Sequence, residues 1–203
     1  MTQLPRLYAV ADGTFGDPVR IARELIDGGS RLVQIRYKSA SAKQLTEAVD
    51  EILRSAPSTA QLIVNDRADV AMVTGAHGVH LGQEDLPPSS ARNVLAHGQL
   101  IGYSTHNLQQ ALDADRLPID YMAVGPIFST TTKRNPDPVV GLKALEDICS
   151  RVKKPVVAIG GITLESALRV LDCGVASVAV IGDILRHGRI ADRTREWVRQ
   201  VDG

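Results

Sequence analysis

"PVVAIGGITLESALRVLDCGVASVAVIGDI", residues 155–184, contains two apolar runs on either side of one helical segment. The runs "PVVAIGG" and "SVAVIGDI" are rich in Val and Ile and alternate little between apolar and polar residues, which is typical of strands covered on both faces. A helical pattern over residues 163–173 lies between them, and Gly174 follows it as a predicted C-terminal cap. A strand, a helix and a second strand in this order indicate a βαβ unit of a parallel sheet.

The same alternation extends over the rest of the chain. Helical patterns cover residues 18–28, 41–53, 88–96, 107–115, 142–152 and 191–201, and Ser41 and Gln44 predict a capping box. Only a short, weakly patterned segment follows the third apolar run. Eight apolar runs in 203 residues favour an α/β fold, a single-domain (β/α)8 TIM barrel over residues 1–203, with a doubly wound open sheet as the alternative. The other six runs are "LYAVAD", "RLVQIRYK", "QLIVND", "GVHLGQED", "LIGYST" and "DYMAVGPI".

The composition excludes some classes of partner. Lys and Arg total 23, as do Asp and Glu, and aromatic residues make up only 3%. We therefore expect no nucleic-acid partner and no membrane affinity, and any anion site must be local. No signal peptide or membrane span is visible, and Cys149 and Cys173 form no C-x-x-C pair, so a cytoplasmic location with reduced thiols is expected.

Polar residues gather where the predicted strands end, which is the active-site face of TIM barrels. In "QIRYK", Gln34, Arg36 and Lys38 alternate and should point into the barrel mouth, while Ile35 and Tyr37 point outward onto helices. Two cations at one place indicate an anionic ligand such as a diphosphate. Internal ion pairs with acids on neighbouring strands are the alternative.

Carboxylates follow the next two strands. Asn65 and Asp66 end "QLIVND", and Asp85 ends "GVHLGQED". Two carboxylates near a basic site indicate Mg²⁺ bridging the protein and a substrate phosphate. The alternative is that Asp66 caps the next helix and Asp85 caps a turn.

The fifth strand is followed by three polar residues. Ser104 or Thr105 is expected to be the N-cap of the helix that begins near Asn107. His106 is a less favoured candidate for catalysis.

Glycines follow the last two strands at Gly160, Gly161 and Ile181–Gly182. Their backbone N–H groups suit the phosphate site that is common in barrels, and tight turns are the alternative.

The sixth strand runs into "GPIFSTTTKRNPDPVVGL", residues 125–142. A further anion-binding site is predicted at Thr130, Thr132 and Lys133. Thr131, which lies between them, should point away from that site. Residues 134–139 form a predicted lid over bound ligands.

Taken together, these motifs resemble the thiamine phosphate synthase family over nearly the whole chain. The family's fold is a (β/α)8 barrel, and its enzymes are Mg²⁺-dependent transferases of thiamine biosynthesis. They join 4-amino-2-methyl-5-hydroxymethylpyrimidine diphosphate to a thiazole phosphate and release pyrophosphate. The most specific combination in this chain is "ND", "GVHLGQED", "GPIF-x-T-x-TK" and "AIGGI".

The resemblance also implies roles for individual residues. Catalysis would fall to Arg36, Lys38, Ser104 and Lys133, and Asp66 and Asp85 would bind Mg²⁺. One departure is Gly182, where members often have Ser. The implied pyrimidine diphosphate contacts are Gln34, Ile35, Arg36, Tyr37, Lys38, Asn65, Ser104 and Lys133, and the implied thiazole phosphate contacts are Thr130, Thr132, Gly161, Ile181 and Gly182.

Three other functions remain open on the sequence. A related thiazole tautomerase would carry a catalytic histidine after the sixth-strand glycine, but this chain has Pro126 there. A non-catalytic sensor of a phosphate ligand and a different phosphosugar enzyme are the other two. The expected partners are the two small-molecule substrates, with a possible homo-oligomer.

Overall fold

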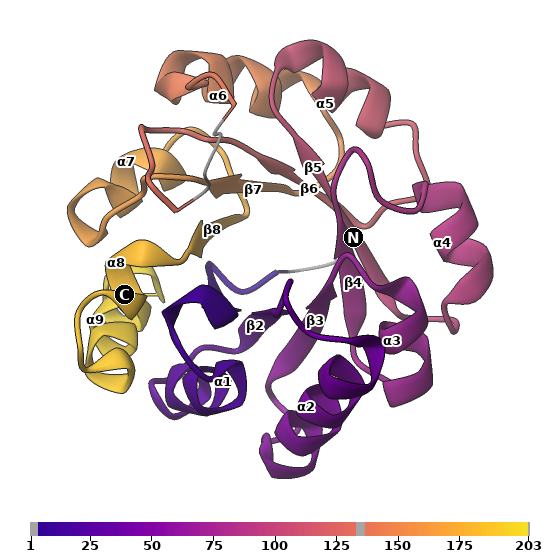
Figure 1. The fold of residues 1–203 in the computed structure, drawn as a ribbon. Coiled ribbons are helices and arrows are strands. Elements are labelled where there is room, and N and C mark those ends of the chain that lie inside the picture. Colours follow the sequence, from indigo (N-terminus) through magenta and orange to yellow (C-terminus); the bar gives the residue numbers. More distant parts are fainter. Residues whose placement is uncertain (1–3, 133–136, 203) are drawn as a thin grey trace.

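The computed structural model of the protein describes residues 4–132 and 137–202. Its strands are parallel, each pairs with the next along the chain, and β8 pairs with β1 to close a barrel (Figure 1). The predicted (β/α)8 barrel is therefore confirmed, and the open-sheet alternative is wrong. The strands are β1 (Leu7–Asp12), β2 (Leu32–Arg36), β3 (Gln61–Asn65), β4 (Gly78–Leu81), β5 (Leu100–Thr105), β6 (Tyr121–Val124), β7 (Val156–Ile159) and β8 (Ser177–Val180).

Helices surround the barrel on the outside (Figure 1). Three of them were not predicted: η1 (Gly13–Phe15), α3 (Ala68–Thr74) and α8 (Gly182–Leu185). The segment predicted as one helix over residues 163–173 is divided into η2 (Leu164–Ser166) and α7 (Ala167–Leu171). In the described part of the chain no helix has the length and apolarity needed to cross a membrane. The helices are η1 (Gly13–Phe15), α1 (Pro18–Asp27), α2 (Ala42–Ser55), α3 (Ala68–Thr74), α4 (Pro88–Val94), α5 (Leu108–Ala114), α6 (Gly141–Arg151), η2 (Leu164–Ser166), α7 (Ala167–Leu171), α8 (Gly182–Leu185) and α9 (Ile190–Asp202).

Helix α2 shows how local sequence sets these elements. The Ser41 hydroxyl accepts a hydrogen bond from the Gln44 amide, and the Gln44 side chain accepts one from the Ser41 amide, so the predicted capping box is present. Its buried residues recur at helical spacing and face the strands. They are Leu45, Ala48, Val49 and Ile52.

The core has two layers because strand residues alternate between the two faces of the sheet. In β2, Val33 and Ile35 belong to the large cluster between strands and helices, whereas Leu32 belongs to a smaller cluster inside the barrel. The inner cluster also contains Tyr8 and Tyr121. Inward-pointing residues near the strand ends therefore reach the face formed by the C-terminal ends of the strands, which we call the carboxyl face.

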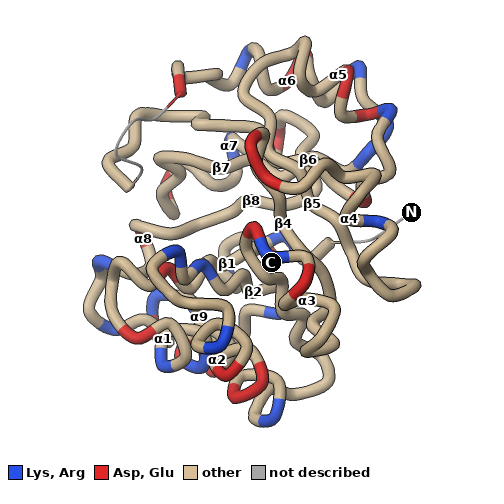
Figure 2. Tube along the Cα trace, turned by 45° about the vertical axis from the view of Figure 1, so that its right-hand side comes forward, with Lys and Arg blue, Asp and Glu red and all other residues tan. Residues whose placement is uncertain are grey.

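Charged residues of both signs are interspersed over the outer helices, for example in α1, α2 and α9 (Figure 2). This distribution agrees with the zero formal net charge of the chain.

Candidate active site

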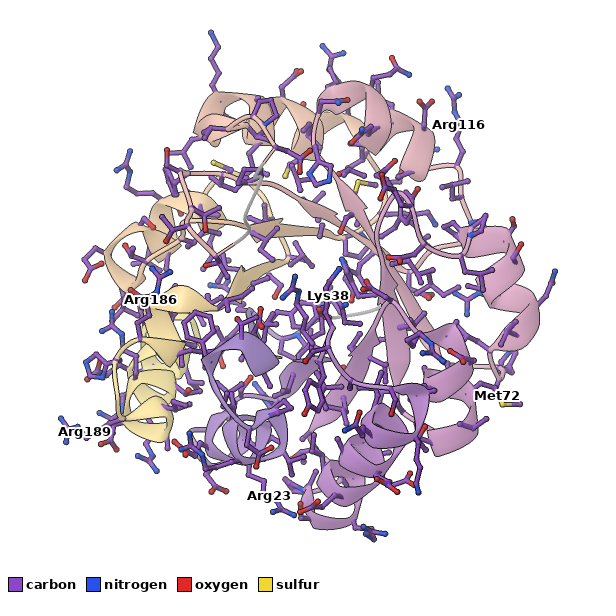
Figure 3. The ribbon with its side chains drawn as sticks, in the orientation of Figure 1. Arg23, Lys38, Met72, Arg116, Arg186 and Arg189 are labelled. Carbon is purple, nitrogen blue, oxygen red and sulfur yellow. The ribbon has the colours of Figure 1, made fainter. Side chains whose placement is uncertain are left out.

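Two carboxylates and a lysine meet at the carboxyl face. Lys38 Nζ lies 3.1 Å from Asp66 Oδ2, and Lys38 is at the centre of the ring of strands in Figure 3, while Arg23 and Arg116 are on its periphery. Burial raises the pKa of Asp85, the neighbouring Asp66 carboxyl raises it further, and the Gly82 amide and Lys38 oppose the rise. The structure thus brings Asp66 and Asp85 together, as the sequence predicted.

Asp66 has an unusual backbone. Its φ of 64° is the only positive value for a non-glycine residue in the described ranges, and its amide donates to the His80 carbonyl oxygen at 2.8 Å. The residue at the N-cap of α3 is Arg67, which makes no side-chain cap bond. The alternative in which Asp66 caps this helix is therefore wrong. Left-handed backbone outside glycine is concentrated at functional sites.

Asp85 also has a local structural role. Its Oδ2 accepts a hydrogen bond from the Gly82 amide at 2.7 Å, so the predicted turn is present. In the described residues no group of three or more His, Cys, Asp or Glu side chains is arranged to hold a metal. Asp66 and Asp85 together would therefore need further oxygen ligands from a substrate or from water.

Arg36 is held by a buried acid. Its Nη1 lies 2.6 Å from Oδ2 of Asp12, which is 1% exposed, and Asp12 Oδ1 accepts from the amide and hydroxyl of Thr14. The alternative of internal ion pairs is thus realised for both cations, Arg36 with Asp12 and Lys38 with Asp66. Sequence reasoning missed Asp12, although the last position of "LYAVAD" was a signal for a group on this face. The pair fixes the direction of the guanidinium before any ligand binds.

A chain of hydrogen bonds crosses the barrel interior below this cluster. Gln34 Nε2 donates to the Tyr8 hydroxyl at 2.8 Å, which lies 2.9 Å from the Tyr121 hydroxyl. The Tyr121 hydroxyl lies 3.2 Å from His80 Nδ1, and His80 Nε2 lies 3.0 Å from Ser104 Oγ. Gln34 therefore points inward, as predicted, and Ser104 ends the chain.

Burial keeps this network uncharged. It lowers the pKa of His80 to about 4, against a smaller opposing effect of Asp85, and it raises the pKa of both Tyr8 and Tyr121. At neutral pH the imidazole therefore has one donor and one acceptor nitrogen. The sequence analysis missed Tyr8, His80 and Tyr121. Their inward strand positions were the available signal.

The segment after β5 differs from the prediction. Neither Ser104 nor Thr105 caps α5, because β5 continues through Thr105 and the Asn107 side chain accepts from the Gln110 amide. The Ser104 hydroxyl therefore does not cap α5. His106 Nδ1 lies 2.6 Å from the Gly125 carbonyl oxygen, so His106 connects the loops after β5 and β6.

The loops after β6, β7 and β8 also come together. A Cβ atom on Gly161, which has a φ of 67°, would lie 2.5 Å from the Ser129 carbonyl oxygen, so this close approach requires glycine. A Cβ atom on Gly182 would lie 3.5 Å from Thr132 Oγ1, and the Thr130 hydroxyl accepts from the Thr132 amide. The structure thus places four predicted phosphate contacts, Thr130, Thr132, Gly161 and Gly182, on adjacent loops.

The remaining predicted residues divide into three groups. Ile35 is fully buried in the outer cluster and Tyr37 packs against that cluster, so both point outward as expected; we restrict the predicted substrate contact of Ile35 to its backbone. Asn65 ends β3 opposite His80 in the register of β4, and Ile181 is the N-cap of α8. Lys133 and part of the predicted lid, residues 134–136, lie outside the described residues.

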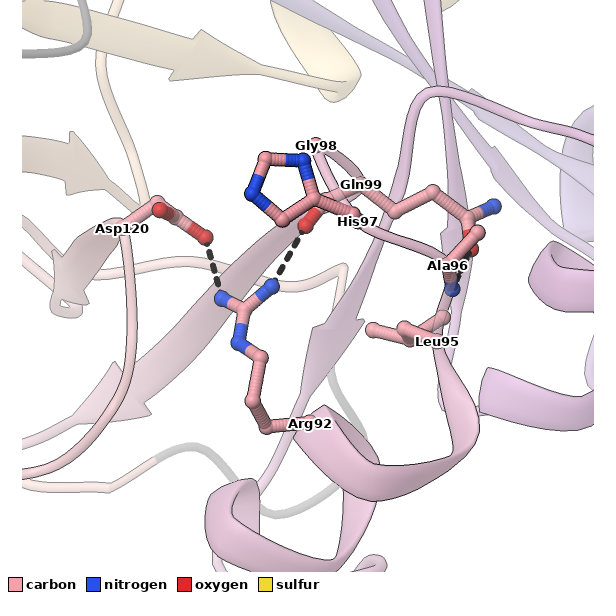
Figure 4. Close-up of a pocket in the computed structure, with 7 residues that line it drawn as sticks. All are labelled: Arg92, Leu95, Ala96, His97, Gly98, Gln99 and Asp120. Atoms are coloured by element: carbon pink, nitrogen blue, oxygen red, sulfur yellow. Dashed lines mark hydrogen bonds and ion pairs between the residues drawn. The ribbon is translucent and has the colours of Figure 1, made fainter.

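A pocket of about 480 Å³ lies away from the carboxyl face, between the end of α4 and the starts of β5 and β6 (Figure 4). Arg92 donates to the Gln99 carbonyl oxygen and to Asp120 Oδ2 across it. The Gln99 side chain bonds to the backbone of Ala71, Ala76 and Ala96. These polar groups are engaged with one another or with backbone, so the pocket has a structural explanation.

Comparisons with known proteins agree with this arrangement. The model of the family described as thiamine monophosphate synthase matches residues 7–184. The chain is 46% identical over 190 residues to a thiamine-phosphate synthase of Koribacter versatilis, covering 90% of each chain. It is 44% identical to a thiamine-phosphate synthase of Chlorobium phaeovibrioides, covering 98% of this chain and 95% of that one. The solved thiamine phosphate pyrophosphorylase of Pyrococcus furiosus superposes with a TM-score of 0.89 at 34% identity, covering 98% of this chain and 96% of that one.

Proposed function

Because the chain belongs to the thiamine monophosphate synthase family, we propose that it is a thiamine-phosphate synthase, a transferase of thiamine biosynthesis. It joins 4-amino-2-methyl-5-hydroxymethylpyrimidine diphosphate to a thiazole phosphate and releases pyrophosphate. The observation that carries the proposal is the meeting of Lys38, Asp66 and Asp85 at the carboxyl face. A basic group and two adjacent carboxylates at the ends of parallel strands suit a substrate that carries a diphosphate.

Asp66 and Asp85 fit a bound Mg²⁺. Burial is the main cause of the raised pKa of Asp85, and the neighbouring Asp66 carboxyl adds to it. A divalent cation would offset both effects by favouring the charged carboxylates. Mg²⁺ commonly takes one or two carboxylates together with substrate phosphate oxygens. When bound, it would supply Lewis-acid stabilisation of negative charge on the diphosphate.

The residues of the chain hold and orient the two substrates. In the proposed reaction the bond between the pyrimidine methylene carbon and the diphosphate oxygen breaks, and its electron pair leaves with the diphosphate. The thiazole nitrogen then donates its lone pair to the resulting cation, forming the new C–N bond. The protein supplies no nucleophile in this scheme, and alignment and charge stabilisation provide the rate.

Individual residues have separate tasks in this scheme. Arg36, already directed by Asp12, and Lys38 stabilise the departing diphosphate, with Lys133 as a further predicted contact. Gln34 and Ser104, at the two ends of the buried hydrogen-bond chain, position the pyrimidine. The thiazole phosphate is placed at the loops after β6, β7 and β8. The cytoplasmic location and the possible homo-oligomer stay predictions.

Pyrophosphate release tests the proposal. Purified protein with Mg²⁺ and pyrimidine diphosphate should release pyrophosphate only after the thiazole phosphate is added, and EDTA should abolish the release. Asp85→Asn should lower kcat/KM at least tenfold, equivalent to about 1.4 kcal/mol, because it removes one of the two carboxylates. Exposed Glu84 is the matched control, and Glu84→Gln should leave the rate unchanged. Release that needs no thiazole phosphate would contradict the synthase proposal, and full activity in EDTA would contradict the metal assignment.

A further inference from the structure

Arg186, four residues beyond Gly182, lies beside the loops assigned above to the thiazole phosphate. A Cβ atom built on Gly182 would lie 3.6 Å from both Cζ and Nη1 of Arg186 and 3.5 Å from Thr132 Oγ1. The guanidinium and the Thr132 hydroxyl therefore both border the space above Gly182. Figure 3 shows Arg186 beside α8 and Arg189 farther out, at the edge of the molecule.

Two contacts hold the guanidinium of Arg186 in this position. Its Nη2 donates to Thr131 Oγ1 at 2.9 Å, and its Cζ lies 5.8 Å from the centroid of the Phe15 ring. A cation over an aromatic face is stabilised by the ring quadrupole. Thr131 was expected to point away from the anion site, and its hydroxyl accepts the hydrogen bond from this arginine.

Arg186 also differs from its neighbours in its charge pairing. Arg189 pairs with Asp192, and Arg193 pairs with Asp183 and Glu196. Within residues 4–132 and 137–202, Arg186 forms no ion pair with a carboxylate. A guanidinium has five N–H donors in a planar fork, and among the described residues the guanidinium of Arg186 forms one hydrogen bond, to Thr131. An exposed, positioned cation with unused donors is suited to a phosphate group.

We propose that Arg186 binds the phosphate group of the thiazole substrate and sets the preference of this site for a phosphorylated thiazole. This inference rests on the proposed function above. The loops after β7 and β8 offer backbone N–H groups, and Arg186 adds a charged contact from the side of the site. The alternative is a structural strut, in which Arg186 only ties Thr131 and Phe15 to α8.

Steady-state kinetics of three variants separate these roles. Arg186→Ala should raise KM for the thiazole phosphate about tenfold, the scale of one hydrogen bond to a charged group, with kcat and KM for the pyrimidine diphosphate within twofold of the unsubstituted protein. Arg186→Lys should recover part of the affinity because it keeps the charge without the fork. Arg189→Ala, which removes an exposed arginine of the same loop, should change neither constant.

Comparison with an unphosphorylated thiazole alcohol provides a second readout. A phosphate contact predicts that Arg186→Ala weakens use of the phosphate and leaves use of the alcohol unchanged, so the preference between them falls about tenfold. If Arg186→Ala lowers kcat/KM equally for both thiazoles, Arg186 has only a structural role and the proposal is overturned. A KM for the thiazole phosphate within twofold of that of the unsubstituted protein would also overturn it.

Binding of inorganic phosphate tests Arg186 without relying on turnover. Calorimetry should show weaker phosphate binding to Arg186→Ala than to Arg189→Ala, and equal binding would overturn the assignment. If the unsubstituted protein makes no thiamine phosphate, the proposed function fails. If it makes thiamine phosphate and the Arg186→Ala constants are unchanged, only the assignment of Arg186 fails.

Discussion

At the residue scale, three glycines allow conformational strain and steric clash to be measured separately. Gly182 has room for a Cβ atom, Gly188 has a φ of 81° with open space around it, and Gly161 has both a positive φ and a contact of 2.5 Å. By urea unfolding we expect a loss of less than about 0.5 kcal/mol for Gly182→Ala, about 1 kcal/mol for Gly188→Ala and more than about 2 kcal/mol for Gly161→Ala. An equal loss for Gly161→Ala and Gly188→Ala would contradict the tight packing of Gly161 against the loop after β6.

His80 should make the stability of the protein depend on pH. Its folded-state pKa is about 4, whereas an unfolded histidine titrates near 6.5, so between these values only the unfolded state takes up the proton. This group alone should therefore lower the free energy of unfolding by about 2 kcal/mol from pH 7 to pH 5. His80→Gln removes the effect, and its urea-unfolding curve over this range should be correspondingly flatter. Parallel curves for the two proteins would show that His80 is not held neutral.

The residues that the sequence did not reveal depend on contacts between strands. Alternation in "QIRYK" was enough to place Gln34 and Arg36 inward and Ile35 outward. It did not give the register that sets Asp12 opposite Arg36, and so the ion pair was only one alternative. The chain from Gln34 to Ser104 likewise depends on which inward side chains meet across a closed barrel, which period-2 patterns do not specify.

At the scale of elements, Asp183 connects α8 to α9 through hydrogen bonds and an ion pair. Its Oδ2 accepts from Nε and Nη2 of Arg193 and from Nε1 of Trp197, and the Asp183 and Arg193 side chains are only 13% and 14% exposed. Asp183→Asn removes the charge that satisfies these donors, and it should cost about 2–4 kcal/mol in urea unfolding.

The matched control for Asp183 is on α9. Asp192 pairs with Arg195, and both side chains are 46% exposed, so Asp192→Asn should cost less than about 1 kcal/mol. Similar losses for the two variants would contradict a specific connection between α8 and α9. Because α8 carries Gly182 and the chain then reaches Arg186, Asp183→Asn should also raise KM for the thiazole phosphate more than KM for the pyrimidine diphosphate.

The sequence predicted which helices are present better than it predicted where they begin and end. The capping box of α2 is encoded by adjacent residues, and its prediction was confirmed. The start of α5 was placed too early, because β5 extends through Thr105 and leaves Asn107 as the cap. Helix α8 is four residues long, too short for an amphipathic period to stand out from the sequence. Helix α3 is as long as α4 and α5, but it has no start signal like Pro88 in α4 or the Asn107 cap of α5, because Arg67 at its N-cap makes no side-chain cap bond.

At the scale of the whole molecule, barrel closure brings distant parts of the chain to one face. The pairing of β8 with β1 places Val180 beside Ala9, so the loop after β8 and the end of β1 share the carboxyl face. The apolar runs predicted this architecture because each strand is covered on both sides. We therefore infer that thiamine phosphate is made at this face.

The most direct test is mass spectrometry of one reaction that contains purified protein, Mg²⁺, pyrimidine diphosphate and thiazole phosphate. We predict thiamine phosphate in an amount equal to the pyrophosphate released, with both products greatly reduced in Asp85→Asn and unchanged in Glu84→Gln. The absence of thiamine phosphate, or its formation at an undiminished rate by Asp85→Asn, would contradict the account.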